Sequence, residues 1–456
     1  MTIVLYGLAL VTVGVYFRRQ AGDAVGFFLA GRRLGALEVG LSLAATGFGG
    51  SAVLMASRLA YGRGLTALWF SGSVALGFGV LGLAFARRIR AGGAHSLADF
   101  IGRDYGEGLR RTVSLLLVII EVAFFGLTVK SFALLTLPLM GGGASFWSAS
   151  AGTIQVAVCV LFVTYTLLGG HRAVAATDLL QMVLIVAALF GLLLPMGLAR
   201  TDFDALPPSM LDWPLSGPSG PVFALNMLVL MGLSGMVGGD VFSKILSARD
   251  PGTARSGALI AAALMAVLAA GVVVLAMCAR GIEPALAQPE LAIPELARHL
   301  LPDAMFQLVV LAFLSVLLST GDSVLITGAT VLALDVFKLH DRASAGAIRG
   351  LTAALAAAGL ALALWMHDLL EIMKFGYTLL TASVAVPVLF VLVMPRRPSA
   401  RVVSAAMATG LAVAVAWQWL ARADLLVSPL EAATAGAAAS AIVMSAGVLL
   451  IRSPAQ

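Results

Sequence analysis

The chain has 456 residues, of which 60% are hydrophobic and only 11% are charged. Its mean hydropathy of +1.01 lies far above that of a water-soluble domain, so the composition excludes a soluble fold. We therefore predict an all-α polytopic membrane protein.

Thirteen apolar runs are long enough to cross roughly 30 Å of hydrocarbon, which needs about 20 residues as a helix. In chain order they cover 2–17, 35–58, 65–86, 112–138, 147–168, 174–198, 219–241, 256–279, 304–336, 350–366, 370–394, 402–421 and 432–451. The loops are too short for a soluble domain. We predict a single transmembrane domain over 1–456, made of an extra N-terminal helix and loop (1–34), a ten-helix core (35–394) and two additional C-terminal helices (395–456).

The chain has a net charge of +6, and the distribution of its Lys and Arg residues among the loops indicates the topology. Counted by alternate loops, 21 Lys and Arg residues fall on one side and 7 on the other, with Lys130 inside a helix. The positive-inside rule places the richer side in the cytoplasm, so the N-terminus is outside and the C-terminus is cytoplasmic. This pattern predicts the plasma (inner) membrane and a lipid bilayer as partner, and it gives no indication of a nucleic-acid partner.

Two predicted helices carry glycine clusters, at 42–51 and 232–240. Glycine inside a helix costs on the order of 1 kcal/mol relative to alanine. The alternative interpretation of either cluster alone is close helix packing. Without the first segment, however, the clusters lie in the first and sixth helices, which correspond in two five-helix halves. Paired broken helices in a 5+5 inverted repeat predict a solute site at the membrane midplane.

A polar stripe follows one face of the helix over 304–336. Helical spacing aligns Asp322 with the hydroxyls of Ser319, Ser323, Thr327 and Thr330. Hydroxyls can bond their own helix carbonyls. A carboxylate inside the membrane is expensive, and Asp322 is therefore expected to face a cation or a proton.

Three more carboxylates lie within apolar segments: Asp178, Glu121 and Asp240. Asp178 alternatively satisfies backbone groups at a helix start. The two cysteines and five histidines show no metal-ligand spacing and no catalytic cluster, so we do not predict an enzyme.

Several short motifs carry a resemblance over nearly the whole chain. They are Phe27–Arg32, Ala60–Gly64, Ser96–Gly106, Tyr165–Gln181, Ile245–Asp250 and Leu318–Ser323, the last followed by Asp335. In this order, and with thirteen helices, they resemble the sodium:solute symporter family.

The resemblance implies a leucine-transporter-type fold, alternating access and a sodium ion between the first and eighth core helices. The implied ligands are the carbonyls of Ala45, Phe48 and Val316 and the hydroxyls of Ser319 and Thr320. A second cation or a proton is implied at Asp178, Asp322 and Ser323, where Asp322 replaces a serine of two-sodium relatives. The substrate candidates are Gly47, Gly49, Gly50, Ser51, Glu121 and Asp240.

We expect a sodium-coupled symporter that imports a small polar organic solute. The coupling ion is sodium, with a proton or a second sodium as the open alternatives, and neither the solute nor the oligomeric state follows from the sequence. The rival functions are a proton-coupled symporter using Asp178 and Asp322, and a transporter-like sensor. No signalling module is expected at the C-terminus.

Overall fold

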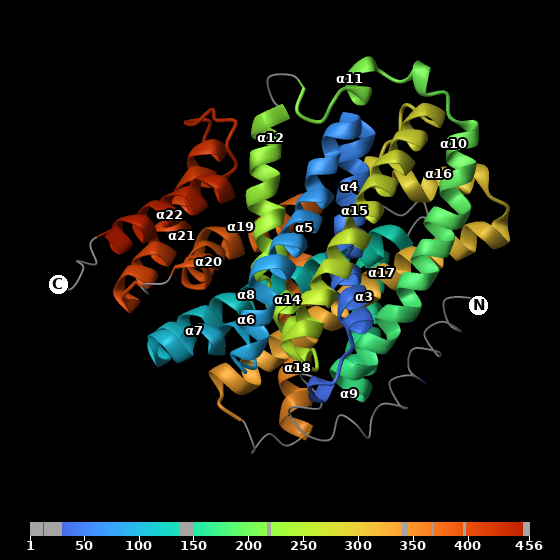
Figure 1. The fold of residues 1–456 in the computed structure, drawn as a ribbon. Helices are drawn as coiled ribbons and strands as arrows, with labels where there is room; N and C mark the ends of the chain where they lie inside the picture. Colours follow the sequence, from blue (N-terminus) through green and yellow to red (C-terminus); the bar gives the residue numbers. More distant parts are fainter. Residues whose placement is uncertain are drawn as a thin grey trace.

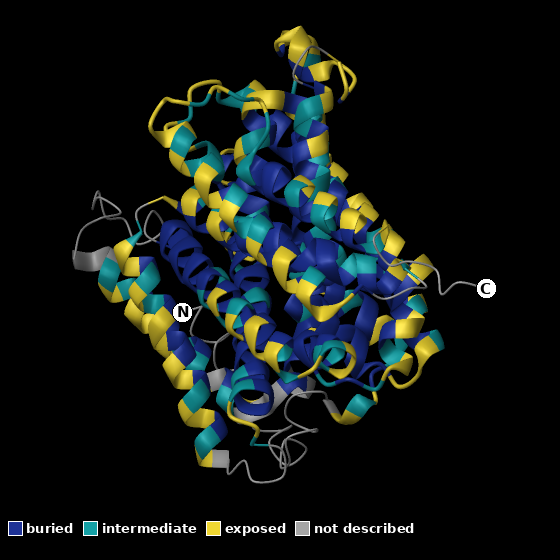
Figure 2. Ribbon diagram, turned by 90° about the vertical axis from the view of Figure 1, so that its left-hand side faces the viewer, coloured by how far each residue is buried: buried dark blue, intermediate teal, exposed yellow. Residues whose placement is uncertain are grey.

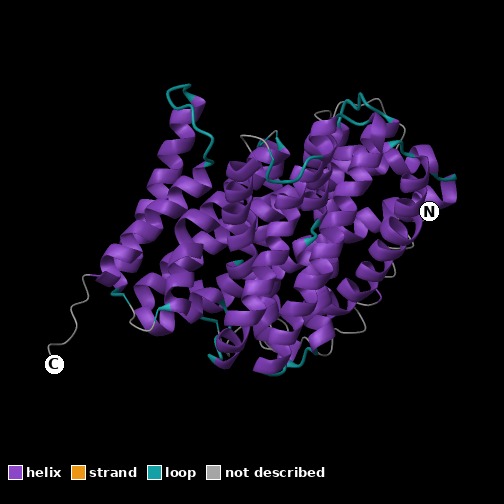
Figure 3. Ribbon diagram, turned by 45° about the horizontal axis from the view of Figure 1, so that its top comes forward, coloured by secondary structure: helices purple, strands orange, loops and turns teal. Residues whose placement is uncertain are grey.

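The computed structural model describes residue 12 and residues 30–136, 149–216, 220–339, 345–366, 368–394 and 398–449. Over these ranges the chain is helical and contains no strand (Figure 3). An isolated bridge pairs Leu34 with Ala248. The predicted segment 2–17 lies outside the described residues, apart from residue 12.

The first half of the core begins with a broken helix and contains a short helix, α7, between its longer ones. Its helices are α3 (Ala36–Gly47), α4 (Gly50–Arg63), α5 (Leu68–Val80), α6 (Ala86–Ala91), α7 (Leu97–Tyr105), α8 (Glu107–Thr136), α9 (Ala149–Ile185) and α10 (Leu194–Arg200). Short 3-10 or π segments, η2 (Ala30–Arg32), η3 (Gly64–Ala67), η4 (Leu81–Phe85) and η6 (Val186–Leu193), precede or join them.

The second half also begins with a broken helix, which follows the connecting segments η7 (Phe203–Ala205) and α11 (Pro208–Leu211). Its helices are α12 (Gly220–Met227), α13 (Leu233–Val237), α14 (Gly239–Ser247), α15 (Pro251–Ile282), α16 (Ala292–Leu300), α17 (Asp303–Thr330), α18 (Ala345–Trp365), α19 (Leu369–Leu379) and α20 (Val386–Val393). The joining segments are η8 (Leu228–Gly232), η9 (Pro289–Leu291), η10 (Val331–Val336) and η11 (Leu380–Ala385).

The last two helices, α21 (Ala400–Arg422) and α22 (Ala432–Leu449), lie side by side at one edge of the molecule (Figure 1, red). Among the described residues, ten helical stretches are long and apolar enough to span a membrane, and two shorter apolar helices, Ala36–Gly47 and Gly152–Thr164, accompany them. The longest stretch, Gly50–Ala91, runs through two predicted spans. The prediction of an all-α multi-pass membrane protein is confirmed.

The chain bends within the long helix α9 (Ala149–Ile185). Phe162 lies against Gly321, because a Cβ on that glycine would stand 2.1 Å from the phenylalanine ring. Asp178, sixteen residues later, is hydrogen-bonded to Ser319. A straight helix would separate these two positions by about 24 Å. Both contact the same turn of α17, so the chain must bend between them, in agreement with separate predicted spans at 147–168 and 174–198.

Over the described residues, apolar side chains are exposed at the surface and several polar and charged ones are buried; Figure 2 shows which parts of the chain are exposed and which are buried. Large apolar side chains on the outer helices are well exposed, for example Leu83, Val183 and Val267. Charged side chains such as Lys130, Lys244 and Asp178 are fully buried instead. This distribution suits a protein whose surroundings are lipid, because hydrocarbon accepts apolar side chains and cannot solvate charges.

Both glycine clusters are helix breaks, as predicted. Phe48 and Gly49 separate α3 from α4, and the extended Gly238 (φ −56°, ψ 144°) separates α13 from α14. The breaks lie in the first and sixth core helices, which confirms the predicted pairing. α17 packs against α3, α4 and α14, and therefore contacts both broken helices.

Close packing against the second broken helix depends on glycine in α5. A Cβ on Gly77 would lie 2.3 Å from the backbone oxygen of Gly232, whereas a Cβ on Gly72 meets nothing within 4 Å. We predict that Gly77→Ala lowers the melting temperature of the purified protein, because a backbone must shift. The control Gly72→Ala, in the same helix, should leave the melting temperature unchanged or raise it, because alanine can add up to about 1 kcal/mol to the free energy of unfolding. Equal effects of the two variants would contradict this packing.

Candidate functional site

The first helix break releases backbone carbonyls next to α17. In an unbroken helix the Gly49 N–H would donate to the Ala45 carbonyl. Here it donates to Thr46 O at 3.1 Å, and Phe48 N donates to Ala44 O at 2.8 Å. α4 then starts a new helix at Gly50. The carbonyls of Ala45 and Phe48 thus lie outside the regular helical ladder, as a cation-binding backbone requires.

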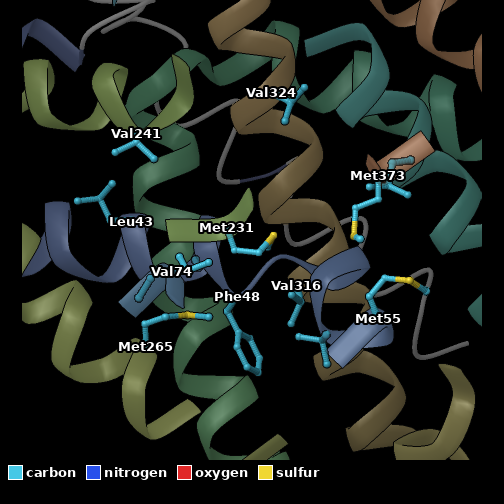
Figure 4. Packing of buried hydrophobic residues seen from close by; sticks show 14 of the residues in the cluster. Leu43, Phe48, Met55, Val74, Met231, Val241, Met265, Val316, Val324 and Met373 are labelled. Carbon is cyan, nitrogen blue, oxygen red and sulfur yellow. The ribbon is translucent and has the colours of Figure 1, made fainter. Parts of the chain in front are cut away.

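α17 approaches this break closely, and two glycines make the approach possible. A Cβ on Gly49 would stand 2.7 Å from Thr320 Oγ1, and a Cβ on Gly50 would stand 2.4 Å from the Leu317 side chain. The Thr320 hydroxyl donates to the Val316 carbonyl at 3.1 Å. Figure 4 shows Phe48 in the connection between α3 and α4, with Val316 of α17 nearby.

The five residues predicted as sodium ligands therefore come from two elements in contact. Ala45 lies in the last turn of α3 and Phe48 in the break that follows it, and the other three lie within five consecutive residues of α17. Ser319 differs from Thr320, because its hydroxyl donates to Asp178 Oδ1. Oxygen ligands from carbonyls and hydroxyls suit a hard monovalent cation and bring no further charge.

Asp178 is buried at the centre of a polar cluster that joins four elements, α9, α3, α17 and α14. Its Oδ1 accepts from Ser319, and its Oδ2 accepts from Ser42 of α3. The ammonium of Lys244, on α14, lies 3.5 Å from Oδ2. Asp178 thus connects α9, α3 and α17, and a lysine stands where a free cation was expected.

Lys244 itself is fully buried and joins the two broken helices. Its Nζ donates to the Ser42 carbonyl at 2.7 Å and to the hydroxyl of Thr46, both on α3. Lys244 lies three residues beyond the predicted span 219–241, and was therefore expected in a loop. The span continues to Ser247. The one available signal was its position four residues after Asp240 on an amphipathic helix.

Asp322 and Ser323 are buried on α17. They lie three and four residues after Ser319, so they share the helix face that meets Asp178. Their assignment to a second cation or a proton stays a prediction.

The second break leaves a carboxylate at the start of α14. Gly238 N donates to Ser234 O at 2.9 Å, and Phe242 N donates to the Gly238 carbonyl at 2.9 Å. Asp240 follows in the first turn, where its Oδ1 accepts from Val241 N at 2.8 Å. The negative side chain therefore stands at the positive end of the helix.

A cavity lies between the two breaks and is walled by α5, α8, α17, α19 and η11. Its lining residues are Thr46, Gly47, Gly49, Ser51, Ala52, Val74, Phe78, Phe124, Leu127, Thr128, Met231, Ser234, Gly235, Gly238, Asp240, Val241, Thr320, Val324, Met373, Tyr377 and Leu380. Val74, Met231, Val324 and Met373 can be followed in Figure 4.

Four of the six predicted substrate residues line this cavity: Gly47, Gly49, Ser51 and Asp240. Gly50 packs against Leu317 instead. Glu121 lies behind Gly239, since a Cβ there would stand 2.7 Å from Glu121 Oε1.

A second ionic cluster lies near the predicted cytoplasmic end of α17 and joins distant sequence motifs. Asp335 Oδ1 accepts from Arg110 Nη2 at 2.7 Å, and its Oδ2 accepts from Ser96 at 2.5 Å. His95 lies between two carboxylates, 3.2 Å from Asp335 and 3.0 Å from Asp99. The cluster ties the α7–α8 region to the end of the α17 span. The motif Ser96–Gly106 and Asp335 were both identified in the sequence, but the contact between them was not predicted.

The comparisons with known proteins point in one direction. The family model described as "Sodium:solute symporter family" matches residues 27–397. The sodium/proline symporter of Staphylococcus aureus (strain bovine RF122 / ET3-1) is 31% identical over 198 residues, which cover 41% of this chain and 37% of that protein. The sodium/proline symporter 2 of Staphylococcus saprophyticus matches with the same identity and coverage. The match thus spans little more than a third of these relatives.

Two solved structures share the fold. A Na⁺-coupled sialic acid symporter in a substrate-bound outward-open state has a TM-score of 0.79 at 17% identity, covering 98% of this chain and 96% of that chain. Mhp1, a nucleobase-cation-symport-1 family transporter in a closed conformation, has a TM-score of 0.51 at 16% identity, covering 96% and 91%. At these identities the likeness shows the architecture alone.

The buried ion pair predicts a large effect of removing Lys244. We expect Lys244→Met to destabilise the protein by about 3–5 kcal/mol, because it leaves Asp178 buried without its cation. Adding Asp178→Asn should recover part of the loss in a double-mutant cycle of melting temperatures. Lys130→Met is the matched control, since Lys130 is equally buried but bonds the carbonyls of Ala363 and Met366. Additive effects of the Lys244 and Asp178 changes would contradict the pairing.

The ionic cluster predicts a pH-dependent contribution from His95. Burial opposes protonation, but the hydrogen bonds and charges of Asp335 and Asp99 outweigh it and raise the pKa of His95. A raised pKa means that the imidazolium stabilises the folded state fully below its unfolded pKa, about 6.5, and loses this effect as the pH rises through the folded value. The melting-temperature difference between wild type and His95→Gln should be largest in acid and shrink in base. A difference that does not change with pH would refute this role.

Proposed function

Because the chain belongs to the sodium:solute symporter family, we propose that it imports a small polar organic solute together with sodium by alternating access. The family is one of transporters rather than enzymes, and the chain is a multi-pass membrane protein. For this chain, the geometry at the two helix breaks supports the proposal.

The observation that carries the proposal is the contact between the first break and α17. The freed carbonyls of Ala45 and Phe48 lie at a break that packs closely against α17, the helix that supplies Val316, Ser319 and Thr320. We assign the coupling sodium to this set. Binding there holds the break against α17, so an ion can stabilise one arrangement of the two halves. A coupling free energy of about 1–3 kcal/mol changes solute affinity by 5- to 150-fold.

We further propose that each cycle uses one sodium ion. Both oxygens of Asp178 already have partners, and one of them is the ammonium of Lys244. Lys244 would then act as a tethered cation at the position that the resemblance gives to a second ion. A second sodium or a proton at Asp178, Asp322 and Ser323 is the alternative, and it requires the lysine to move.

The orientation and the division of the chain are also proposals. The excess of Lys and Arg on alternate loops favours an inner-membrane protein with the N-terminus outside and the C-terminus in the cytoplasm. The ten-helix core over 35–394 would carry transport, and the helices of 395–456 would flank it. In this orientation the cluster of Asp335, Arg110 and His95 lies on the cytoplasmic side, where it would have to open before the solute leaves.

Thermal melting tests the sodium site without knowledge of the solute. Sodium should raise the melting temperature relative to potassium at equal ionic strength. At a hundredfold excess of sodium over its Kd, the free energy of unfolding should increase by about 2.7 kcal/mol. Thr320→Ala should abolish this rise. Thr330→Ala is the control, because Thr330 also bonds its own helix carbonyl on α17 but lies away from the break. A protein that responds equally to sodium and potassium does not have this site.

Solute accumulation separates transport from sensing. In proteoliposomes with an inward sodium gradient, a symporter concentrates its solute and stops when the gradient is dissipated. A sensor would bind solute without accumulation, and a proton-coupled symporter would follow a pH gradient in the absence of sodium.

A further inference from the structure

The cavity between the breaks has an unbalanced charge. Its described lining contains one carboxylate, from Asp240, and no Lys, Arg or His side chain. Lys244 is the nearest basic residue along α14, but its ammonium points to α3 and Asp178 instead. An anionic group in this cavity would meet no positive side chain, whereas a cationic group would meet a carboxylate.

Asp240 also changes what the start of α14 can bind. The N-terminus of a half-helix at membrane depth commonly receives the anionic group of a solute. In this chain the Val241 N–H is already bonded to Asp240 Oδ1 at 2.8 Å. The protein's own carboxylate therefore occupies the anion position, and Asp240 also lines the cavity.

A second carboxylate stands behind the first. Glu121 is 1% exposed, and its Oε1 would lie 2.7 Å from a Cβ on Gly239, the residue before Asp240. Its Oε2 has no hydrogen-bond partner among the described residues. Two neighbouring carboxylates in a membrane interior repel each other unless a cation or a proton lies between them.

Aromatic rings also line the cavity. Phe124 of α8 and Tyr377 of α19 have ring centroids 4.7 Å apart. Phe78 of α5 adds a third ring. Ring faces attract ammonium groups, more strongly when water is excluded. One carboxylate and three rings in the same lining make a suitable environment for an organic cation.

We propose that the transported solute carries an ammonium group, which binds between Asp240 and the rings of Phe124 and Tyr377, with Glu121 behind it. This inference rests on the proposed symport function, since it names the solute class of the same cavity. The ammonium is distinct from the coupling sodium, which is assigned to the wall formed by Gly49 and Thr320. The alternative is that Asp240 only accepts the Val241 N–H in the first turn of α14. A serine or asparagine could also accept it without placing a charge at membrane depth.

Solutes that do or do not carry a positively charged nitrogen test the proposal. The probes are L-proline and L-prolinamide, which carry the ammonium, and N-acetyl-L-proline, which lacks it. Choline and its neutral isostere 3,3-dimethylbutan-1-ol form a second pair. Melting temperatures of the purified full chain are measured in sodium and in potassium. We expect ammonium-bearing probes to raise the melting temperature in sodium, and their counterparts to have no effect.

The variant Asp240→Asn keeps a side-chain oxygen for the helix cap but removes the charge. It should weaken binding of the ammonium probes by about 10- to 100-fold, as expected for a hydrogen bond to a charged group. Asp250→Asn is the matched control, because Asp250 caps α15 through Thr253 N at 2.8 Å. If Asp240→Asn fails to fold, the selectivity of the wild-type protein still decides.

The outcomes separate the two proposals. A sodium response without any effect of the ammonium probes, or a preference for the uncharged or anionic members, overturns the ammonium assignment and leaves sodium coupling intact. Absence of a sodium-specific response, with ammonium binding that is lost in Asp240→Asn, supports the cavity assignment and overturns the sodium site. No response to any ammonium probe in either salt overturns the assignment of the cavity.

Discussion

Backbone groups released at the first helix break must be satisfied inside the protein, because the hydrocarbon around it offers no water. This constraint explains why α17 lies against the connection at Phe48 and Gly49 and presents hydroxyls there. It also explains the glycines, whose missing side chains permit the approach. A break that needs an external ligand to complete its bonding is a natural place for a transported cation.

Lys244 gives the same region a second constraint. It extends from the second broken helix to the first and reaches Asp178 at the same time. Movement of one broken helix relative to the other must therefore change the surroundings of a buried charge. We propose that joint binding or release of ion and solute offsets this cost, which would couple the two.

The two ends of this arrangement have different chemistry. Near the break the proposed ligands are neutral oxygens, whereas the cavity beyond it is lined by Asp240 and aromatic rings. Toward the predicted cytoplasmic side, Asp335 and Arg110 belong to a network of ion pairs. We therefore propose that the polar groups of the interior divide into an ion region, a solute region and a network that closes the cytoplasmic side.

The sequence predicted those features that depend on local chemistry. Glycine clusters predicted the breaks because glycine tolerates interrupted helices, and the position of Asp178 within an apolar segment identified it as a carboxylate at membrane depth. The role of Lys244 was not predicted, because the apolar run ended at residue 241 and the lysine was therefore expected in a loop. The meeting of Ser96 with Asp335, 239 residues apart, depends on packing that no local pattern shows.

The most direct measurement is equilibrium binding of radioactive sodium to the purified protein. The account predicts saturation at a single sodium ion per chain, since the carbonyls and hydroxyls at the break form one site and Lys244 occupies the other cation position. Saturation at two ions would show that a second sodium ion displaces the Lys244 ammonium from Asp178. No saturable binding would contradict the central claim that the break and α17 form a sodium site.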